Sequence, residues 1–152
     1  MEEKLLTELS KTLYRKLFNE FPEWQKYAEI VDADYDINQK SLYLKIPAPV
    51  DERHFLSILE RGDCIEVAFS NENPSTAAEA QILCEQDNDI LCVEAVIQFV
   101  RKIVNEEIVI GQRHASWLSR RKLLSFIKRA KTDEKKFAKI YSWRGNFNSS
   151  VS

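Results

Sequence analysis

Carboxylates stand at every second position between Asp32 and Asp36. With Asp34 between them, the spacing matches the opening of a calcium-binding loop, which also needs glycine at its sixth position and a bidentate carboxylate at its twelfth. Those positions hold Ile37 and Tyr43, so calcium binding is not expected. In a strand, the three aspartates would project from one face about 6.6 Å apart. They would form an acidic ridge suited to a cationic partner, or simply a solvated outer face.

Basic residues gather in the last part of the chain. A helix over residues 119–131 would place several of them along one side, where they could track the phosphates of a nucleic acid. Trp117 and Trp143 could then stack on bases. The alternative interpretation is a solvated basic face. The candidate phosphate-binding residues are Arg120, Arg121, Lys122, Lys128 and Arg129.

Residues for metal binding or covalent catalysis are sparse. His54 and His114 are the only histidines, and there is no close ligand pair such as Cys-x-x-Cys. Cys64, Cys84 and Cys92 lie in or beside apolar patterns, which favours a packing role. With 3 glycines in the chain, loops that cradle phosphates or dinucleotides are nearly excluded. We therefore expect no metal, no cofactor and no enzymatic activity.

Acidic and basic residues are concentrated in different parts of the chain. Residues 1–110 carry 22 Asp/Glu against 11 Lys/Arg, a net charge of −11, whereas residues 111–152 carry 2 against 11, a net charge of +9. Such asymmetry bears on partners and association rather than on fold. It is consistent with an acidic surface for a cationic partner, a basic surface for nucleic acid, or two parts that neutralise each other.

Length and composition predict one domain over residues 1–152, with an acidic part (1–110) and a basic part (111–152). A hydrophobic content of 44% is ordinary for a globular protein. The acidic N-terminus lacks the features of a secretion signal, and no apolar run approaches the ~20 residues that span a bilayer. We expect a cytoplasmic protein without membrane contact.

Hydrophobic periodicity predicts the elements. Apolar residues recur every three to four positions in the expected helices and alternate with polar ones in the expected strands. Residues 53–60 could also be a short helix, and residues 77–86 suit either state. The fold class is α+β: one antiparallel or mixed sheet with helices packed mainly on one face. The predicted elements are a helix over 2–20, strands over 31–37 and 41–46 joined by a turn at 38–40, strands over 53–60 and 65–69, a helix over 92–104, a strand over 108–110, a helix over 119–131 and a last strand over 137–141.

Four sequence stretches carry a resemblance. They are Leu-Tyr-Leu-Lys-Ile-Pro-Ala-Pro over 42–49, Ile-Glu-Val-Ala-Phe over 65–69, a helix running into Glu-Glu-Ile-Val over 99–110, and Tyr-Ser-Trp-Arg-Gly over 141–145. Through them, roughly residues 40–146 resemble a group of small bacterial proteins of the toxin-immunity type. The chain departs from that group just after Phe69, where a His-rich stretch is missing.

The resemblance implies a non-enzymatic protein that binds and neutralises a cognate toxin domain. The charge pattern places that contact on an acidic surface, where complementary charge speeds association and a few buried anchors hold the complex. Tyr43, expected to point outward, is the predicted anchor. The alternative is a nucleic-acid-binding module that uses the basic C-terminal segment. The predicted partner-binding residues are Asp32, Asp34, Asp36, Tyr43 and Glu72.

Overall fold

The computed structural model describes residues 3–71, 76–78, 80–83, 88–113, 122–131 and 136–150. Helices and strands both occur throughout this part of the chain, and the predicted α+β class is confirmed. The helices are η1 (Glu3–Leu5), α1 (Glu8–Glu20), η2 (Pro22–Tyr27), α2 (Asp89–Val104) and η3 (Arg129–Lys131), of which the three labelled η are 3-10 helices. The strands are β1 (Ala28–Ala33), β2 (Asp36–Pro47), β3 (His54–Glu60), β4 (Ile65–Asn71), β5 (Thr76–Ala78), β6 (Gln81–Leu83), β7 (Ile108–Arg113), β8 (Lys122–Lys128), β9 (Phe137–Tyr141) and β10 (Ser149–Ser150).

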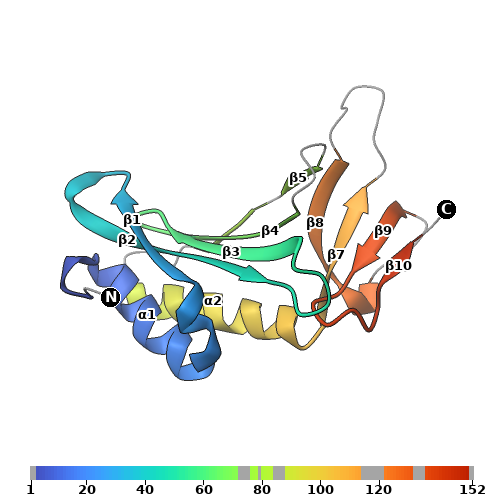
Figure 1. Ribbon diagram of the computed structural model, residues 1–152, viewed down its shortest axis with the longest axis horizontal. Coiled ribbons are helices and arrows are strands. Elements are labelled where there is room, and N and C mark those ends of the chain that lie inside the picture. The colour runs from blue at the N-terminus through green and yellow to red at the C-terminus, as the bar shows by residue number, and fades with distance from the viewer. Residues whose placement is uncertain are drawn as a thin grey trace. The chain divides into compact units, whose positions relative to one another are not determined.

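The strands form two sheets instead of the single sheet that the sequence suggested (Figure 1). One has the order β1-β2-β3-β4-β6 and the other β10-β9-β7-β8-β5. In the first, β1 and β2 pair antiparallel. In the second, β7 pairs antiparallel with both β8 and β9, whereas β5 and β8 run parallel, so this sheet is mixed.

Packing divides the chain into two compact units, and the charge follows that division. Unit 1 carries 16 Asp/Glu against 8 Lys/Arg, a net charge of −8, and unit 2 carries 8 against 14, a net charge of +6. The excess of acidic residues therefore belongs to unit 1 and the excess of basic residues to unit 2. Unit 1 contains residues 1–46, 57–67 and 82–98, and unit 2 contains residues 47–56, 68–81 and 99–152.

Helix α1 of unit 1 begins at an N-cap and ends at a proline. The Thr7 hydroxyl oxygen accepts a hydrogen bond from the Ser10 N–H at 3.1 Å, which satisfies one of the unpaired donors of the first turn. Pro22 disfavours helical geometry at Phe21, and the helix ends one residue earlier. The helix predicted over residues 2–20 is thus confirmed from residue 8 onward.

The first hairpin is confirmed, but its turn lies earlier than predicted. Asp34 and Tyr35 form the turn, because Ala33 pairs with Asp36. The register shifts next to Asp32. As a result, the strict alternation expected over residues 31–37 does not occur.

The second hairpin and helix α2 agree with the sequence. Residues 54–60 form strand β3, which pairs in a hairpin with β4, so the alternative of a short helix over residues 53–60 is wrong. The Asn88 side chain accepts a hydrogen bond from the Leu91 N–H at 3.1 Å and so caps α2. Within unit 1, α1 and the first turns of α2 lie along the same face of the sheet (Figure 1). The core there is fully buried, with Leu13 and Leu17 of α1 as examples.

The basic helix predicted over residues 119–131 is wrong. Residues 122–128 form β8, which pairs with β7 on one side and with β5 on the other. Leu124 and Ser125 are buried and Phe126 and Ile127 are half-buried, so apolar side chains occur on both faces of the strand. A strand enclosed in this way reads as a short apolar run, which periodicity cannot distinguish from a helix.

In unit 2 the turn between α2 and β7 is tied to the C-terminal turn. Glu106 has a positive φ of 62° and a buried side chain. Its carboxylate accepts hydrogen bonds from the Asn146 backbone N–H at 3.2 Å and from Asn146 Nδ2 at 2.5 Å. Trp143 in the same turn is buried, as expected for a residue that closes a strand. The stretches 99–110 and 141–145, which carry part of the resemblance, therefore belong to one structural feature: the contact between these two turns.

Candidate functional site

The three predicted aspartates do not share one strand face. Asp32 lies on β1, Asp34 lies in the turn, and Asp36 is the first residue of β2. Asp32 and Asp34 are exposed, whereas Asp36 is half-buried and accepts a hydrogen bond from the Asn38 N–H at 2.9 Å. The acidic ridge is replaced by carboxylates distributed over the end of β1, the turn and the start of β2. We call residues 32–40 the hairpin tip.

Two basic side chains partly neutralise these carboxylates. The Lys40 ammonium group forms an ion pair with Asp32. The Arg61 guanidinium donates from Nη1 to Asp34 at 2.6 Å and from Nε to Glu66 at 2.7 Å. The hydrogen bonds to Glu66 and Asp34 raise the pKa of Arg61, so this side chain stays charged. With Asp36 included, four carboxylates face two cations, which leaves the surface with a net charge of −2.

The hairpin tip also exposes apolar side chains that the sequence pattern placed in the core. Ile37 is 90% exposed and Tyr35 is 52% exposed. The early turn is the cause, because it removes both residues from the alternation that would have buried them. Lone exposed apolar residues are common on protein surfaces. Here two exposed apolar side chains belong to a hairpin tip that also carries Asp32, Asp34 and Asp36, and such mixtures of apolar and charged groups are common at protein interfaces.

A buried carboxylate holds the hairpin tip from behind. Glu60 is 2% exposed and accepts three hydrogen bonds from hydroxyl groups. The Thr7 and Tyr35 hydroxyls donate to its Oε1 at 2.6 and 3.0 Å, and the Ser41 hydroxyl donates to its Oε2 at 2.5 Å. The donors come from the α1 N-cap, the hairpin turn and β2. Glu60 therefore fixes the turn relative to the rest of unit 1.

The neighbouring turn is shaped to accept the Tyr35 ring. Gly62 has a φ of +106°, which side chains rarely adopt, and a Cβ there would lie 2.9 Å from Tyr35 Cε1. Burial and the negative charge of Glu60 raise the pKa of Tyr35. The phenol thus remains protonated and able to donate at neutral pH.

The other two predicted contact residues lie elsewhere. Tyr43 is half-buried on β2 and pairs across the sheet with Glu29 of β1. Burial, followed by the charge of Glu29, raises the pKa of Tyr43. It is part of the sheet rather than of the hairpin tip, so Ile37 takes its place as the candidate anchor. Glu72 lies outside the described residues.

The predicted nucleic-acid-binding residues are only partly within the described chain. Arg120 and Arg121 lie outside it, and Lys122 is described only as the first residue of β8. Lys128 and Arg129 line a pocket in unit 2. Lys128 is the last residue of β8 and Arg129 is the first residue of η3, so the two do not lie along one side of a helix as the sequence suggested.

The side chains that the sequence missed are Ile37, Glu60 and Arg61. Ile37 fits the alternating pattern of a half-buried strand, which predicts a buried side chain. Glu60 ends an apolar strand in which its neighbours Leu56 and Ile58 are buried, and an acid at the next position of that face signals a polar network. Arg61 follows it directly, and only the fold brings it to Asp34.

Comparison with protein-family models, with curated proteins and with solved structures finds no match. Among the described residues, no group of three or more His, Cys, Asp or Glu side chains could hold a metal ion. No helix in the described part of the chain is long and apolar enough to cross a membrane. Functional inference therefore rests on the surfaces of the two units.

Proposed function

We propose that this protein is a non-enzymatic binding protein of the immunity type, which neutralises a basic toxin domain in the cytoplasm by docking on the hairpin tip. The observation that carries the proposal is the exposure of Tyr35 and Ile37 in a hairpin tip that also carries three aspartates. Interfaces place apolar anchors at their centre and polar groups at their rim. Ile37 would be the central anchor, and Asp32 and Asp34 would form part of the rim.

Charge supports a basic partner. Unit 1 has a net charge of −8, and the hairpin tip with Arg61 and Glu66 retains −2 after its internal ion pairs. An acidic body attracts a basic one over about a Debye length, ~8 Å at physiological salt, and this mainly accelerates association. A nuclease-type toxin is a fitting partner because its active site must be basic to bind a polyanion.

Rigidity supports the hairpin tip as the contact. The Glu60 hydrogen bonds hold the Tyr35 hydroxyl, and the pair of Arg61 with Asp34 holds the turn. A surface that is ordered before binding loses less conformational entropy on association. This favours a tight complex despite the small size of the hairpin tip.

The test begins with capture of partners by the tagged protein from its native host, after nuclease treatment. The candidate toxin domain is then expressed alone, and its toxicity is measured with and without this protein. Ile37→Ala should weaken the complex about 30-fold, the effect of losing a central anchor worth about 2 kcal/mol. Ile82→Ala, which truncates another exposed isoleucine of unit 1, should not weaken it.

Charge is tested separately by replacing Asp32, Asp34 and Asp36 with asparagine in one variant. Association should slow and its dependence on salt should decrease, while dissociation changes less. The proposal fails if the captured partner is not toxic. It also fails if Ile37→Ala and the triple variant both bind and neutralise the toxin as well as the unaltered protein does.

A further inference from the structure

Unit 2 contains a pocket of about 410 Å³ where α2 ends and β8 passes into η3. This volume lies within the ~300–1,000 Å³ range of small-molecule sites, so the pocket can hold more than a single ion. It is lined by Lys102, Glu107, Ile108, Lys128, Arg129 and Ala130.

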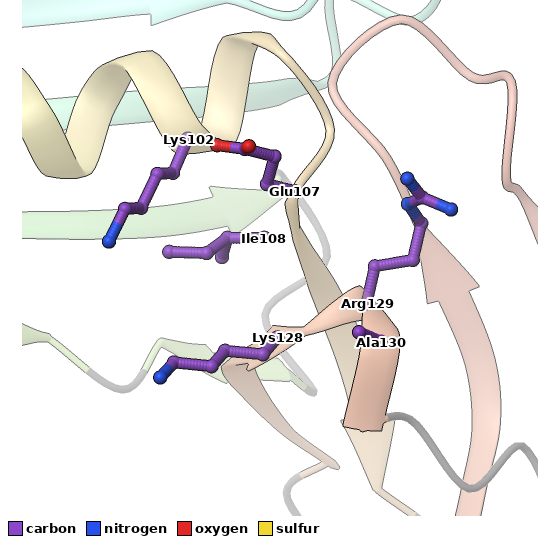
Figure 2. A pocket seen from close by; sticks show the side chains of 6 residues that line it. All are labelled: Lys102, Glu107, Ile108, Lys128, Arg129 and Ala130. Atoms are coloured by element: carbon purple, nitrogen blue, oxygen red, sulfur yellow. The ribbon is translucent and has the colours of Figure 1, made fainter.

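An aromatic contact joins the two elements that carry the lysines of the pocket. Phe99 of α2 meets Phe126 of β8 edge to face, with ring centroids 5.0 Å apart. Lys102 follows Phe99 by three residues on the same side of the helix, and Lys128 follows Phe126 by two residues on the same face of the strand. Ile108 lies directly opposite Lys128 in the register of β7 and β8. Figure 2 shows the two lysine side chains extending in the same direction on either side of Ile108.

Hydrogen bonds fix the backbone around the pocket. The Glu107 N–H donates to the Lys102 carbonyl at 2.9 Å, and the Arg129 N–H donates to the Glu107 carbonyl at 2.8 Å. Arg129 Nε also donates to the Glu106 carbonyl at 2.9 Å, and its guanidinium lies 4.1 Å from the centroid of the Phe147 ring. The backbone of the lining is therefore held in place before any ligand arrives.

The lining combines positive charge with an apolar floor. The lining contains three basic residues and one carboxylate, a formal charge of +2, and the unit as a whole carries +6. Ile108 is buried and forms the apolar floor, and the exposed Ala130 adds apolar surface to the lining. Lysine ammonium groups are compact charges that bind phosphate without a fixed orientation. Carboxylate ligands would gain less, because they offer fewer acceptor oxygens to two separate ammonium groups.

We propose that this pocket binds a small phosphate ester. The phosphate lies between the ammonium groups of Lys102 and Lys128, and the organic body covers Ile108 and Ala130. This inference goes beyond toxin binding and does not depend on it, because it concerns residues of unit 2 only.

The test uses the whole 152-residue chain and phenyl phosphate, a small molecule that has both parts. Binding is followed by backbone amide shifts in a ¹⁵N-labelled sample, with inorganic phosphate and phenol as the two halves of the probe. Phenyl phosphate should bind more tightly than either half and shift the amides of residues 102–108 and 128–130. Lys102→Gln and Lys128→Gln should each weaken binding about fivefold, the effect of one exposed ion pair.

Two further variants separate the pocket from the general positive charge of unit 2. Lys139→Gln removes an exposed lysine of β9 outside the pocket and should leave binding unchanged. Glu107→Gln removes the only carboxylate of the lining and should tighten binding severalfold. Adenosine monophosphate and a short single-stranded oligonucleotide then distinguish a free phosphate ester from a phosphate within a nucleic acid.

The proposal is overturned if no probe shifts the pocket amides at millimolar concentration. It is also overturned if inorganic phosphate binds as well as phenyl phosphate, which would mean an adventitious ion only. Equal losses in the Lys139 variant and in the two pocket variants would assign the binding to general charge. Failure of toxin binding would leave this test unaffected.

Discussion

Glu60 is expected to be among the most important polar residues for the stability of unit 1. The substitution Glu60→Ala removes the shared acceptor of three hydroxyl groups. Thr7 and Ser41 are 4% and 2% exposed, so water cannot readily replace the carboxylate there. Tyr35 is half exposed, and its hydroxyl can turn to solvent. The cost should therefore come mainly from the two buried hydroxyls and from the cavity.

The magnitude follows from these partners. A buried donor left without an acceptor costs ~1–3 kcal/mol, so the two buried hydroxyls together cost ~2–6 kcal/mol. Removing a carboxylate that is buried away from water is itself favourable and offsets part of this cost in free energy. We expect Glu60→Ala to lower the free energy of unfolding by about 3–4 kcal/mol. Glu60→Gln keeps the shape and one acceptor oxygen but loses the charge, and it should cost about 1–2 kcal/mol.

Urea denaturation measures both effects, with tryptophan fluorescence and far-UV circular dichroism as independent probes. Trp24 is buried in unit 1 and reports on the unit that contains Glu60. The midpoint should fall while the slope stays constant, which indicates a change in stability and not in the compactness of the unfolded state. Glu52→Ala, at an exposed turn position, serves as the matched control and should change stability by less than about 0.5 kcal/mol.

Loss of less than about 1 kcal/mol in Glu60→Ala would refute the reasoning, since it would mean that the buried hydroxyls find other acceptors. An equal loss of unfolding free energy in Glu60→Ala and Glu60→Gln would contradict the role of Glu60 as a shared acceptor. In that case the charge, and not the presence of an acceptor, would carry the whole effect.

Two further predictions concern unit 2. Gly111→Ala should lower stability by ~1–3 kcal/mol in thermal or urea unfolding, because the new Cβ would clash with Ile127 Cδ1 and would lie 2.7 Å from Phe137 Cδ1 in the centre of the sheet. An unchanged midpoint would show that both side chains can move aside. Burial alone would raise the pKa of Glu106, but hydrogen bonds from the C-terminal turn outweigh it and hold that pKa below 4.5. The stabilisation of the folded state by ionised Glu106 is therefore complete above pH 4.5, and it is lost as the pH falls through the lower folded-state pKa. Glu106→Gln should be less stable than the unaltered protein at pH 7, with a difference that shrinks in urea titrations below pH 4.5; a constant difference would contradict this linkage.

Sequence patterns predicted the elements wherever one face of a helix or strand is solvated. Helices α1 and α2 and the two hairpins have clear periods of 3.6 or 2, and each was found close to its predicted position. The basic helix over residues 119–131 failed because β8 is enclosed by strands on both sides. Its apolar run has no clean period, so local sequence did not distinguish strand from helix.

The candidate site was predicted only in its charge. Asp32, Asp34 and Asp36 were recognised as a group, but their arrangement around a turn depends on Glu60 and Arg61, which follow them by more than twenty residues. The exposure of Ile37 follows from the same turn. A strand pattern cannot show where a hairpin reverses when distant side chains hold the turn.

The amino-acid sequence by itself determined the α+β class, most of the elements and the separation of acidic from basic residues. Only the tertiary structure decided that the strands form two sheets, that the excess charges belong to two compact units of −8 and +6, and that Lys102 joins Lys128 at one pocket. The physical reason is one of range. Periodicity and capping act over a few residues, whereas strand pairing, ion pairs and pockets join residues that are distant in the chain.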